Sequence, residues 1–281
     1  MSTINTNVAA IKARGSLDKV QRELNTSISR LSSGNRITRA HDDASGLAIS
    51  GRMESQIRGL SMNVRNAKDG QALVDTQEGA LQEITNMLQR MRELAVQASS
   101  GSVNQNTEDK GYLQLENKAI QDEIIAVGLN TQFNGKSVLD GSSFSFYTDI
   151  DTSGTAIATF GATITGAKLF GNNAYTAPMS IGGGETVTGV AAVISLVDQA
   201  IATVAGIRAN LGAISNRFDH VIDNLSNVIG NTEDARSRVQ DSDFAVETTA
   251  LTRNTILQQS ATTMVAQANA VKNTILALIQ G

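Results

Sequence analysis

The two histidines are the residues of this chain best suited to acid–base or metal chemistry, and neither has companions at a catalytic spacing. His41 and His220 lie far apart in the sequence, and the chain has no cysteine. A zinc protease would need two histidines on one turn of a helix with a glutamate between them. We therefore expect no catalytic residue and no metal ligand, and a solvated histidine is the favoured interpretation at both positions.

Two acidic pairs and one glycine run resemble parts of ion or phosphate sites. Asp149 and Asp151, like Asp241 and Asp243, alternate with a single intervening residue. Neither pair continues into the glycine and final glutamate of a calcium loop, so solvated turns are favoured. The three glycines at 182–184 have no lysine after them and no strand–turn–helix context, which argues against a phosphate-binding loop. The sequence predicts a protein that is not an enzyme and has no cofactor.

The composition is that of a chain built from helices packed along apolar seams. The chain has 281 residues with one proline, no tryptophan and only 4% aromatic residues. Because large rings usually fill a core, Leu, Ile, Val and Ala must here pack along helices instead. The net charge is −4 with both signs interspersed, which predicts no nucleic-acid partner. No continuous apolar run reaches the roughly 18 residues of a membrane span, which predicts no membrane insertion.

The two ends of the chain carry heptad patterns, which predict apolar stripes that other helices must cover. The C-terminal stripe has steps of four and three: Leu257, Ala261, Met264, Ala268, Val271, Ile275 and Leu278. The N-terminal end has two shorter seams, Ile4, Val8 and Ile11, then Leu17, Val20, Leu24, Ile28 and Leu31. Gly34 is the expected stop of the first helix. We expect the terminal helices to pair, with further copies of the chain covering the rest.

Between the ends, the same rhythm predicts long helices. The first follows a loop in which Asp42, Asp43 and Ser45 are candidate caps. Polar residues stand at two of its predicted seam positions, Gln71 and Glu78. Either they lie at an edge that solvent reaches, which is the favoured interpretation, or they set the register between helices or subunits.

The predicted fold class is mainly α: a long antiparallel helical rod or coiled-coil bundle with a small β-hairpin region in the middle of the chain. Residues 140–189 differ from the rest because aromatic residues and glycines punctuate short strand-like stretches. The expected segments are a terminal helix, N-terminal rod helices, a short β or variable region, a C-terminal rod helix and a second terminal helix: 1–44, 45–139, 140–189, 190–238 and 239–281.

Long motifs at both ends resemble the bacterial flagellin family. They are INTNVAA, LSSGNRITRAHDDASGLAIS, LQRMRELAVQA and TQFNGKSVLDG at the N-terminal end, then VQDSDFAVET and ILQQSATTMVAQANAVKNTILALI at the C-terminal end. The resemblance covers about residues 1–140 and 190–281, so the chain is similar to a short form with little or no outer variable domain. It departs from many members near its end, where Ala270 follows QAN in place of a proline.

The resemblance implies a structural subunit that polymerises into the bacterial flagellar filament for swimming motility. Residues 1–44 and 239–281 would form the inner tube, and the chain would be exported unfolded by the flagellar type III apparatus to the extracellular flagellum. Implied partners are further copies of the chain, the export chaperone and export gate, and the hook–filament junction and cap proteins. The residues expected to pack in the filament core are Ile4, Val8, Ile11, Leu17, Val20, Leu24, Ile28, Leu31, Leu257, Met264, Val271, Ile275 and Leu278.

The resemblance also implies recognition by the host Toll-like receptor for flagellin, which in the family reads a face of the long rod helix. Gln89, Arg90, Glu93 and Leu94 stand in the matching motif, LQRMRELAVQ. Glu116 is the best match for a partner on the shorter helix. The alternative role of these residues is packing between protofilaments, and the two roles are compatible.

Three other classes of protein remain open at this point. A hook–filament junction protein shares helical termini, and polymerisation of the purified chain into long filaments would distinguish the two. A flagellin-like chain with a protease in its middle would carry HExxH there, which this sequence lacks. A generic coiled-coil adaptor would have the heptads without the loop motifs.

Overall fold

The computed structural model describes residues 6–100, 107–147, 156–159 and 187–280. The chain forms two compact units: unit 1 comprises Met1–Ile57 and Gly230–Gly281, and unit 2 comprises Arg58–Ile229. Both boundaries fall inside long helices, whereas the segments expected from sequence divide near helix ends. A helix can continue where its packing partner changes, so helix ends and unit boundaries need not coincide.

Helix α1 (Val8–Ser33) has a defined start and stop. The side chain of Asn7 accepts a hydrogen bond from the Ala10 N–H at 3.0 Å, which satisfies one of the free donors of the first turn. Gly34 has φ 71°, and its N–H donates to the carbonyl of Arg30 at 2.8 Å. The predicted helix stop at Gly34 is confirmed, because this left-handed conformation suits glycine.

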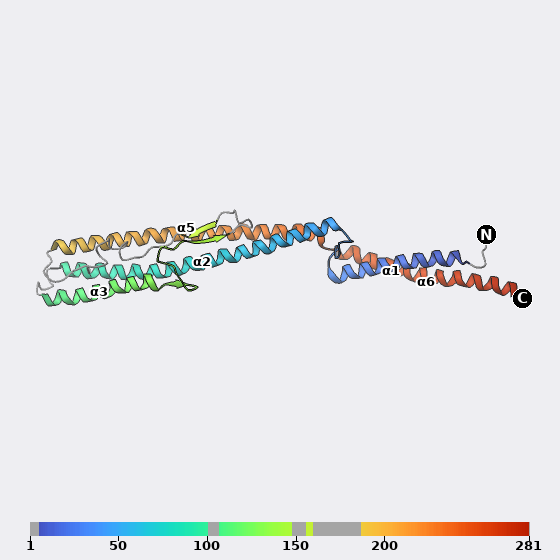
Figure 1. Ribbon diagram of the computed structural model, residues 1–281, viewed down its shortest axis with the longest axis horizontal. Coiled ribbons are helices and arrows are strands. Elements are labelled where there is room, and N and C mark those ends of the chain that lie inside the picture. The colour runs from blue at the N-terminus through green and yellow to red at the C-terminus, as the bar shows by residue number, and fades with distance from the viewer. Residues whose placement is uncertain (1–5, 101–106, 148–155, 160–186, 281) are drawn as a thin grey trace. The chain divides into compact units, whose positions relative to one another are not determined.

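Helix α2 (Ala44–Ser99) begins at one of the three candidate caps. Oδ1 of Asp43 accepts hydrogen bonds from the N–H groups of Ser45 and Gly46 at 3.1 and 2.9 Å. An aspartate cap stabilises a helix by roughly 0.5–2 kcal/mol relative to alanine. The other helices of the described residues are α3 (Thr107–Asn130), α5 (Val187–Gln240) and α6 (Phe244–Gln280) (Figure 1).

Within unit 1, backbone pairing joins the segment after α1 to the turn between α5 and α6. The N–H of Arg36 donates to the carbonyl of Gln240 at 2.7 Å, and the N–H of Ser242 donates to the carbonyl of Gly34 at 2.9 Å. Ile37, next in the chain, is buried. Two stretches about two hundred residues apart in sequence are therefore fastened by their main chains.

Helices α2 and α5 of unit 2 run antiparallel. As the residue number rises along α2, the number of its partner on α5 falls. Three polar pairs join the two helices: Gln71–Asp219 at 2.8 Å, Glu78–Arg208 at 2.8 Å and Arg92–Asp198 at 2.7 Å. Gln71 and Glu78 are half-buried, so they lie at a seam edge, and each also has a specific partner across the seam. The two interpretations offered from sequence are therefore not exclusive.

The predicted seam of α2 is shifted by one residue at its two polar positions, whereas its apolar positions are buried or half-buried. Gly70 and Gln77 are buried where the sequence pattern favoured Gln71 and Glu78. The Gln77 side chain is fully buried, and its Nε2 donates to the carbonyl of Val138 at 2.7 Å. Burying an amide that has a hydrogen-bond partner costs little free energy. Gln77 can therefore lie in the buried seam although it is polar.

In the described part of the stretch between α3 and α5, the chain forms two small β-hairpins. Strands β1 (Gln132–Phe133) and β2 (Lys136–Ser137) pair across a turn in which Asn134 and Gly135 have φ values of 50° and 75°. Positive φ at both central positions is the type I′ geometry that the dipeptide Asn-Gly favours. This hairpin lies before the predicted β region, and the Asn-Gly signal could have located it.

The second hairpin lies inside the predicted region of residues 140–189. Strand β3 (Phe144–Tyr147) pairs antiparallel with β4 (Ala156–Thr159), with Phe144 opposite Thr159. The prediction of a mainly α fold with a small β-hairpin region in mid-chain is confirmed. The rest of the predicted region, 148–155 and 160–186, lies outside the described residues.

Gly70 lets aromatic rings lie against the backbone of α2. A Cβ at this position would be 2.6 Å from Cζ of Phe218 and 3.1 Å from Cδ2 of Phe146. We expect Gly70→Ala to destabilise unit 2 by about 1–3 kcal/mol through overpacking, partly offset by the roughly 1 kcal/mol that alanine gains in a helix. Gly79→Ala is the matched control, because no atom lies within 4 Å of its added Cβ.

Thermal unfolding should therefore distinguish the two glycine variants. The unfolding temperature of unit 2 should fall for Gly70→Ala and rise or stay unchanged for Gly79→Ala. Equal stabilisation by both substitutions would show that the ring contact does not restrict position 70.

One described helix could cross a membrane as judged by length and composition alone, the Gly189–Gln240 part of α5. The core helix of a water-soluble protein passes the same test. The apolar residues of α5 include Val190, Val197 and Val204, which lie in the hydrophobic core of unit 2. This packing accounts for the apolar composition, and the absence of membrane insertion stays a prediction from sequence.

Candidate assembly surface and charged cluster

Helices α1 and α6 pair antiparallel within unit 1 through apolar, small and polar residues (Figure 1). Three contacts between side chains, or from a side chain to a carbonyl, run along the pair: Asn7 to the carbonyl of Ala268, Gln258 to Gln21, and Arg30 to Glu247. The expected pairing of the terminal helices is present. Because polar groups that find partners can be buried at little cost, polar residues share this seam with leucines and valines.

The apolar stripe predicted on α6 does not face α1, and this part of the sequence-based interpretation is wrong. Leu257, Met264 and Val271 are 44%, 61% and 56% exposed. The covered row lies on a neighbouring face of the helix, and it shares only Ala261 and Ala268 with the predicted stripe. The row consists of Glu247, Leu251, Asn254, Gln258, Ala261, Val265 and Ala268, all buried or half-buried.

The residues predicted to pack in the filament core fall into two groups. Leu17, Val20, Leu24 and Leu31 are buried or half-buried on α1, on the side that pairs with α6. The others with described side chains are exposed, and we call them the assembly surface: Val8, Ile11 and Ile28 on α1, and Leu257, Met264 and Val271 on α6. Ile4 and the side chains of Ile275 and Leu278 lie outside the described residues.

Three further exposed apolar residues of α6 did not enter the predicted set. Phe244, Val246 and Ile256 are 58%, 63% and 60% exposed. They lie off the heptad rhythm, so a search restricted to one seam passes over them. Their signal is an apolar residue at a position that no intramolecular seam uses, and clustered apolar exposure of this kind marks an interaction surface.

A charged cluster joins α2 and α3 in unit 2. Arg90 donates to Oε1 of Glu116 from Nε at 3.0 Å and from Nη2 at 2.8 Å, and its Nη1 lies 3.1 Å from Oε2 of Glu93. The hydrogen bonds to Glu116, then those to Glu93, raise the pKa of Arg90 above its usual range. All three side chains are exposed, as is Gln89. Four of the five residues predicted to contact the receptor therefore share one accessible region.

Leu94 is the exception among the predicted receptor contacts. Its side chain is 0% exposed and belongs to the hydrophobic core of unit 2. A partner cannot touch it while the helices stay packed, so its assignment as a contact residue is corrected. It sits on the inner face of α2, where apolar character reflects packing with the core.

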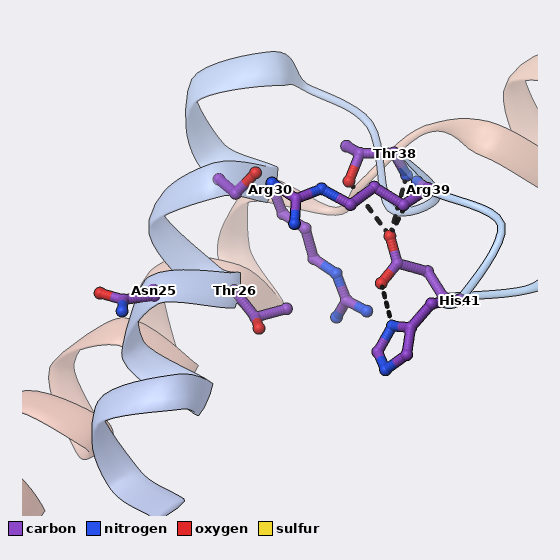
Figure 2. Close-up of a pocket in the computed structure, with 8 residues that line it drawn as sticks. Asn25, Thr26, Arg30, Thr38, Arg39 and His41 are labelled. Carbon is purple, nitrogen blue, oxygen red and sulfur yellow. Dashed lines mark hydrogen bonds and ion pairs between the residues drawn. The ribbon is translucent and has the colours of Figure 1, made fainter. Parts of the chain in front are cut away.

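A hollow of about 170 Å³ lies in unit 1 between α1 and the loop that follows it (Figure 2). Asp42 is the carboxylate of its lining. Oδ2 of Asp42 accepts hydrogen bonds from the backbone N–H groups of Thr38 and Arg39 at 3.2 and 3.0 Å, and Oδ1 lies 3.4 Å from Nδ1 of His41. These hydrogen bonds lower the pKa of Asp42 to about 2, and those from the two backbone N–H groups have the largest effect.

We expect the Asp42 carboxyl to titrate near pH 2 in an NMR titration of the folded chain. Its pKa in the folded chain is below the value of about 3.9 in an unfolded chain. The stabilisation of the folded chain by the ionised Asp42 carboxylate is therefore fully present above about pH 4 and is lost as the pH falls toward 2. Asp42→Asn should remove this pH dependence and speed amide exchange at Thr38 and Arg39. A transition at the ordinary aspartate value would contradict the hydrogen-bond assignment.

No group of three or more His, Cys, Asp or Glu side chains that could hold a metal occurs in the part of the chain that the structure describes. His41 and His220 are both exposed. Of the acidic pairs, Asp243 caps α6 through the N–H of Ala245 at 2.8 Å, and Asp241 accepts a hydrogen bond from Ser237. The other acidic pair and the glycine run lie outside the described residues.

Unit 1 leaves large apolar residues of its paired helices exposed, which is the character of a structural protein that assembles with further chains. Residues 4–143 match the bacterial flagellin N-terminal helical region, and residues 194–279 match the bacterial flagellin C-terminal helical region. The chain belongs to the flagellin family. Flagellins are structural proteins that form the extracellular bacterial flagellar filament, so the prediction of a filament subunit that is not an enzyme is confirmed.

Relatives match along almost the whole chain. The chain is 37% identical to flagellin of Bacillus subtilis over 307 aligned residues, which cover 99% of each chain. It is 32% identical to flagellin B of Vibrio cholerae, covering 98% of this chain and 99% of the relative. A solved structure described as a flagellar hook-associated protein from Vibrio parahaemolyticus matches with a TM-score of 0.61 at 15% identity, covering 71% of this chain and 100% of that one. This last match shows a shared fold alone.

Proposed function

We propose that copies of this chain polymerise through the assembly surface, with α1 and α6 at the core of the filament. The observation that carries the proposal is that the pairing of α1 and α6 leaves six large apolar residues of these helices, those of the assembly surface, exposed. Each Leu, Ile or Val that a neighbour buries contributes roughly 1.5–3 kcal/mol. A head-to-tail contact that does not close produces an open helical polymer.

Electron microscopy of the purified chain tests this proposal. The chain is dissociated in acid, returned to neutral pH with short filament seeds and examined by negative stain. Long filaments support a filament subunit. Short or absent polymers under conditions in which the Bacillus subtilis relative polymerises would favour the hook–filament junction class.

The same helices support a proposal for export and its partners. The seam between α1 and α6 mixes polar with apolar residues, so the pair should open more easily than one with a fully apolar seam, as export of an unfolded chain by the type III apparatus requires. The exposed apolar residues of α6 offer an export chaperone, the export gate, and the junction and cap proteins a surface to bind. Detection of the chain outside cells that lack the flagellar export apparatus would refute the export route.

We further propose that the charged cluster of Gln89, Arg90, Glu93 and Glu116 is the surface that the host Toll-like flagellin receptor reads. The cluster is exposed in the single chain, and the two carboxylates hold the Arg90 guanidinium in one place. A fixed guanidinium loses less freedom on binding than a mobile one. Arginine is also among the residues that carry most binding energy at interfaces.

Arg90→Ala should reduce receptor signalling by the monomeric chain by roughly tenfold or more, as expected for an anchoring arginine. Arg92→Ala is the matched control, because Arg92 is an exposed arginine of the same helix that pairs with Asp198 of α5 instead. Circular dichroism should show both variants folded. Unchanged signalling by Arg90→Ala, or an equal loss in Arg92→Ala, would exclude the cluster as the receptor contact.

A further inference from the structure

The hollow in unit 1 has a lining that favours a negatively charged ligand. Arg30 comes from α1, and Arg39 and His41 come from the loop that follows it (Figure 2). Asp42 is the carboxylate in this lining, and its oxygens are engaged by groups of the same loop. The lining thus holds two guanidinium groups and one carboxylate, and that carboxylate accepts hydrogen bonds from backbone N–H groups.

The two arginines retain hydrogen-bonding capacity that their own chain does not use. Nη1 of Arg30 lies 3.9 Å from Oε2 of Glu247, which is too far for a hydrogen bond. Nε of Arg30 is buried and makes no hydrogen bond to the described residues. Within the same part of the chain, the Arg39 guanidinium forms no ion pair. A guanidinium carries five N–H donors, so several remain open to an acceptor.

The neighbouring polar side chains of the lining contribute unequally. Oδ1 of Asn25 accepts from Nε2 of Gln21 at 3.4 Å, and the Asn25 side chain points away from the loop at 38–42 (Figure 2). Thr26 donates its hydroxyl to the carbonyl of Arg22 at 2.9 Å, so it offers no further proton. Ser29 supplies a second hydroxyl. The guanidinium group of an arginine can bind two oxygens of one carboxylate or phosphate at the same time.

We propose that the hollow between α1 and the loop at 38–42 binds an oxyanion group, held by Arg30 and Arg39, with the Ser29 hydroxyl as a further donor. Two sources share this chemistry: a free phosphate-type anion, and a carboxylate side chain of a second copy of the chain. The second source rests on the proposed polymerisation, whereas the first does not. The volume of about 170 Å³ holds either group together with a few water molecules.

Inorganic phosphate is the probe that tests the site on the full-length monomer. Amide and side-chain NMR signals of residues 25–42 are followed during titration with sodium phosphate, against sodium chloride at equal ionic strength. Saturable shifts at Arg39 and Ser29 are expected in the native chain. Arg39→Gln should weaken phosphate binding by at least tenfold, while Arg14→Gln, an exposed arginine of α1 outside the hollow, should leave it unchanged.

Assembly kinetics separate the two sources. If a carboxylate of a second copy occupies the hollow, phosphate at matched ionic strength should slow polymerisation of the native chain and of Arg14→Gln. If the ligand is a free anion, phosphate should bind without slowing polymerisation. Absence of saturable binding, or equal binding by Arg39→Gln, overturns the site. A chain that does not polymerise refutes the proposed function, and the phosphate titration still decides the site.

Discussion

Leu257→Asp should abolish filament formation while leaving the single chain folded. The side chain is 44% exposed in the chain, so the substitution resembles a surface change, which usually alters stability by less than about 0.5 kcal/mol. In the proposed filament the same position is covered by a neighbouring copy. There the variant loses roughly 1.5–3 kcal/mol of apolar burial and must also desolvate a carboxylate, at a further cost of several kcal/mol.

Sedimentation and negative-stain microscopy measure the loss of polymer, and circular dichroism with thermal unfolding measures the fold. Met264→Asp, on the same stripe, should also abolish filament formation while leaving the single chain folded. Leu257→Met is the matched control, because it keeps the apolar volume and should polymerise. Normal polymerisation of Leu257→Asp would remove the stripe from the assembly surface, and unfolding of both aspartate variants would show that it is needed within the single chain.

The sequence predicted the helices of this chain well because heptad periodicity and caps are local signals. Gly34 and Asp43 occupy positions that turn chemistry alone identifies, and both act as expected. The class of protein and the charged residues around Arg90 came from the family motifs, since no spacing of residues marks a receptor contact. Predicting these features required no knowledge of which faces of the helices pack together.

The choice of covered face could not be predicted, because the pattern treats apolar character as burial. On α6 several large apolar residues face outward, and Gln258 and Glu247 are covered because Gln21 and Arg30 meet them. These partners lie more than two hundred residues away in the sequence. The partner of a polar group decides whether it can be buried, and only the three-dimensional pairing reveals that partner.

The one-residue shift at the two polar seam positions of α2 has the same origin and leads to a close contact at Gly70. The buried row includes Gly70, which ranks as a poor helix and seam residue in sequence terms. Its missing side chain makes room for the ring of Phe218, which is fully buried. The Phe218 ring meets Phe146 of strand β3 edge to face, with centroids 6.0 Å apart. A glycine on one helix thus allows a ring on another helix to hold the hairpin.

Phe218→Ala should therefore destabilise unit 2 by about 3–5 kcal/mol, the range for removing a buried aromatic ring. The cavity would open between α2, α5 and β3, so the hairpin should loosen along with the helices. Denaturant unfolding measures the loss, and amide exchange along Phe144–Tyr147 reports the hairpin. Tyr147→Ala is the matched control, because that ring belongs to the same strand and is 53% exposed. If Phe218→Ala costs no more than Tyr147→Ala, the ring pair does not anchor the hairpin to the bundle.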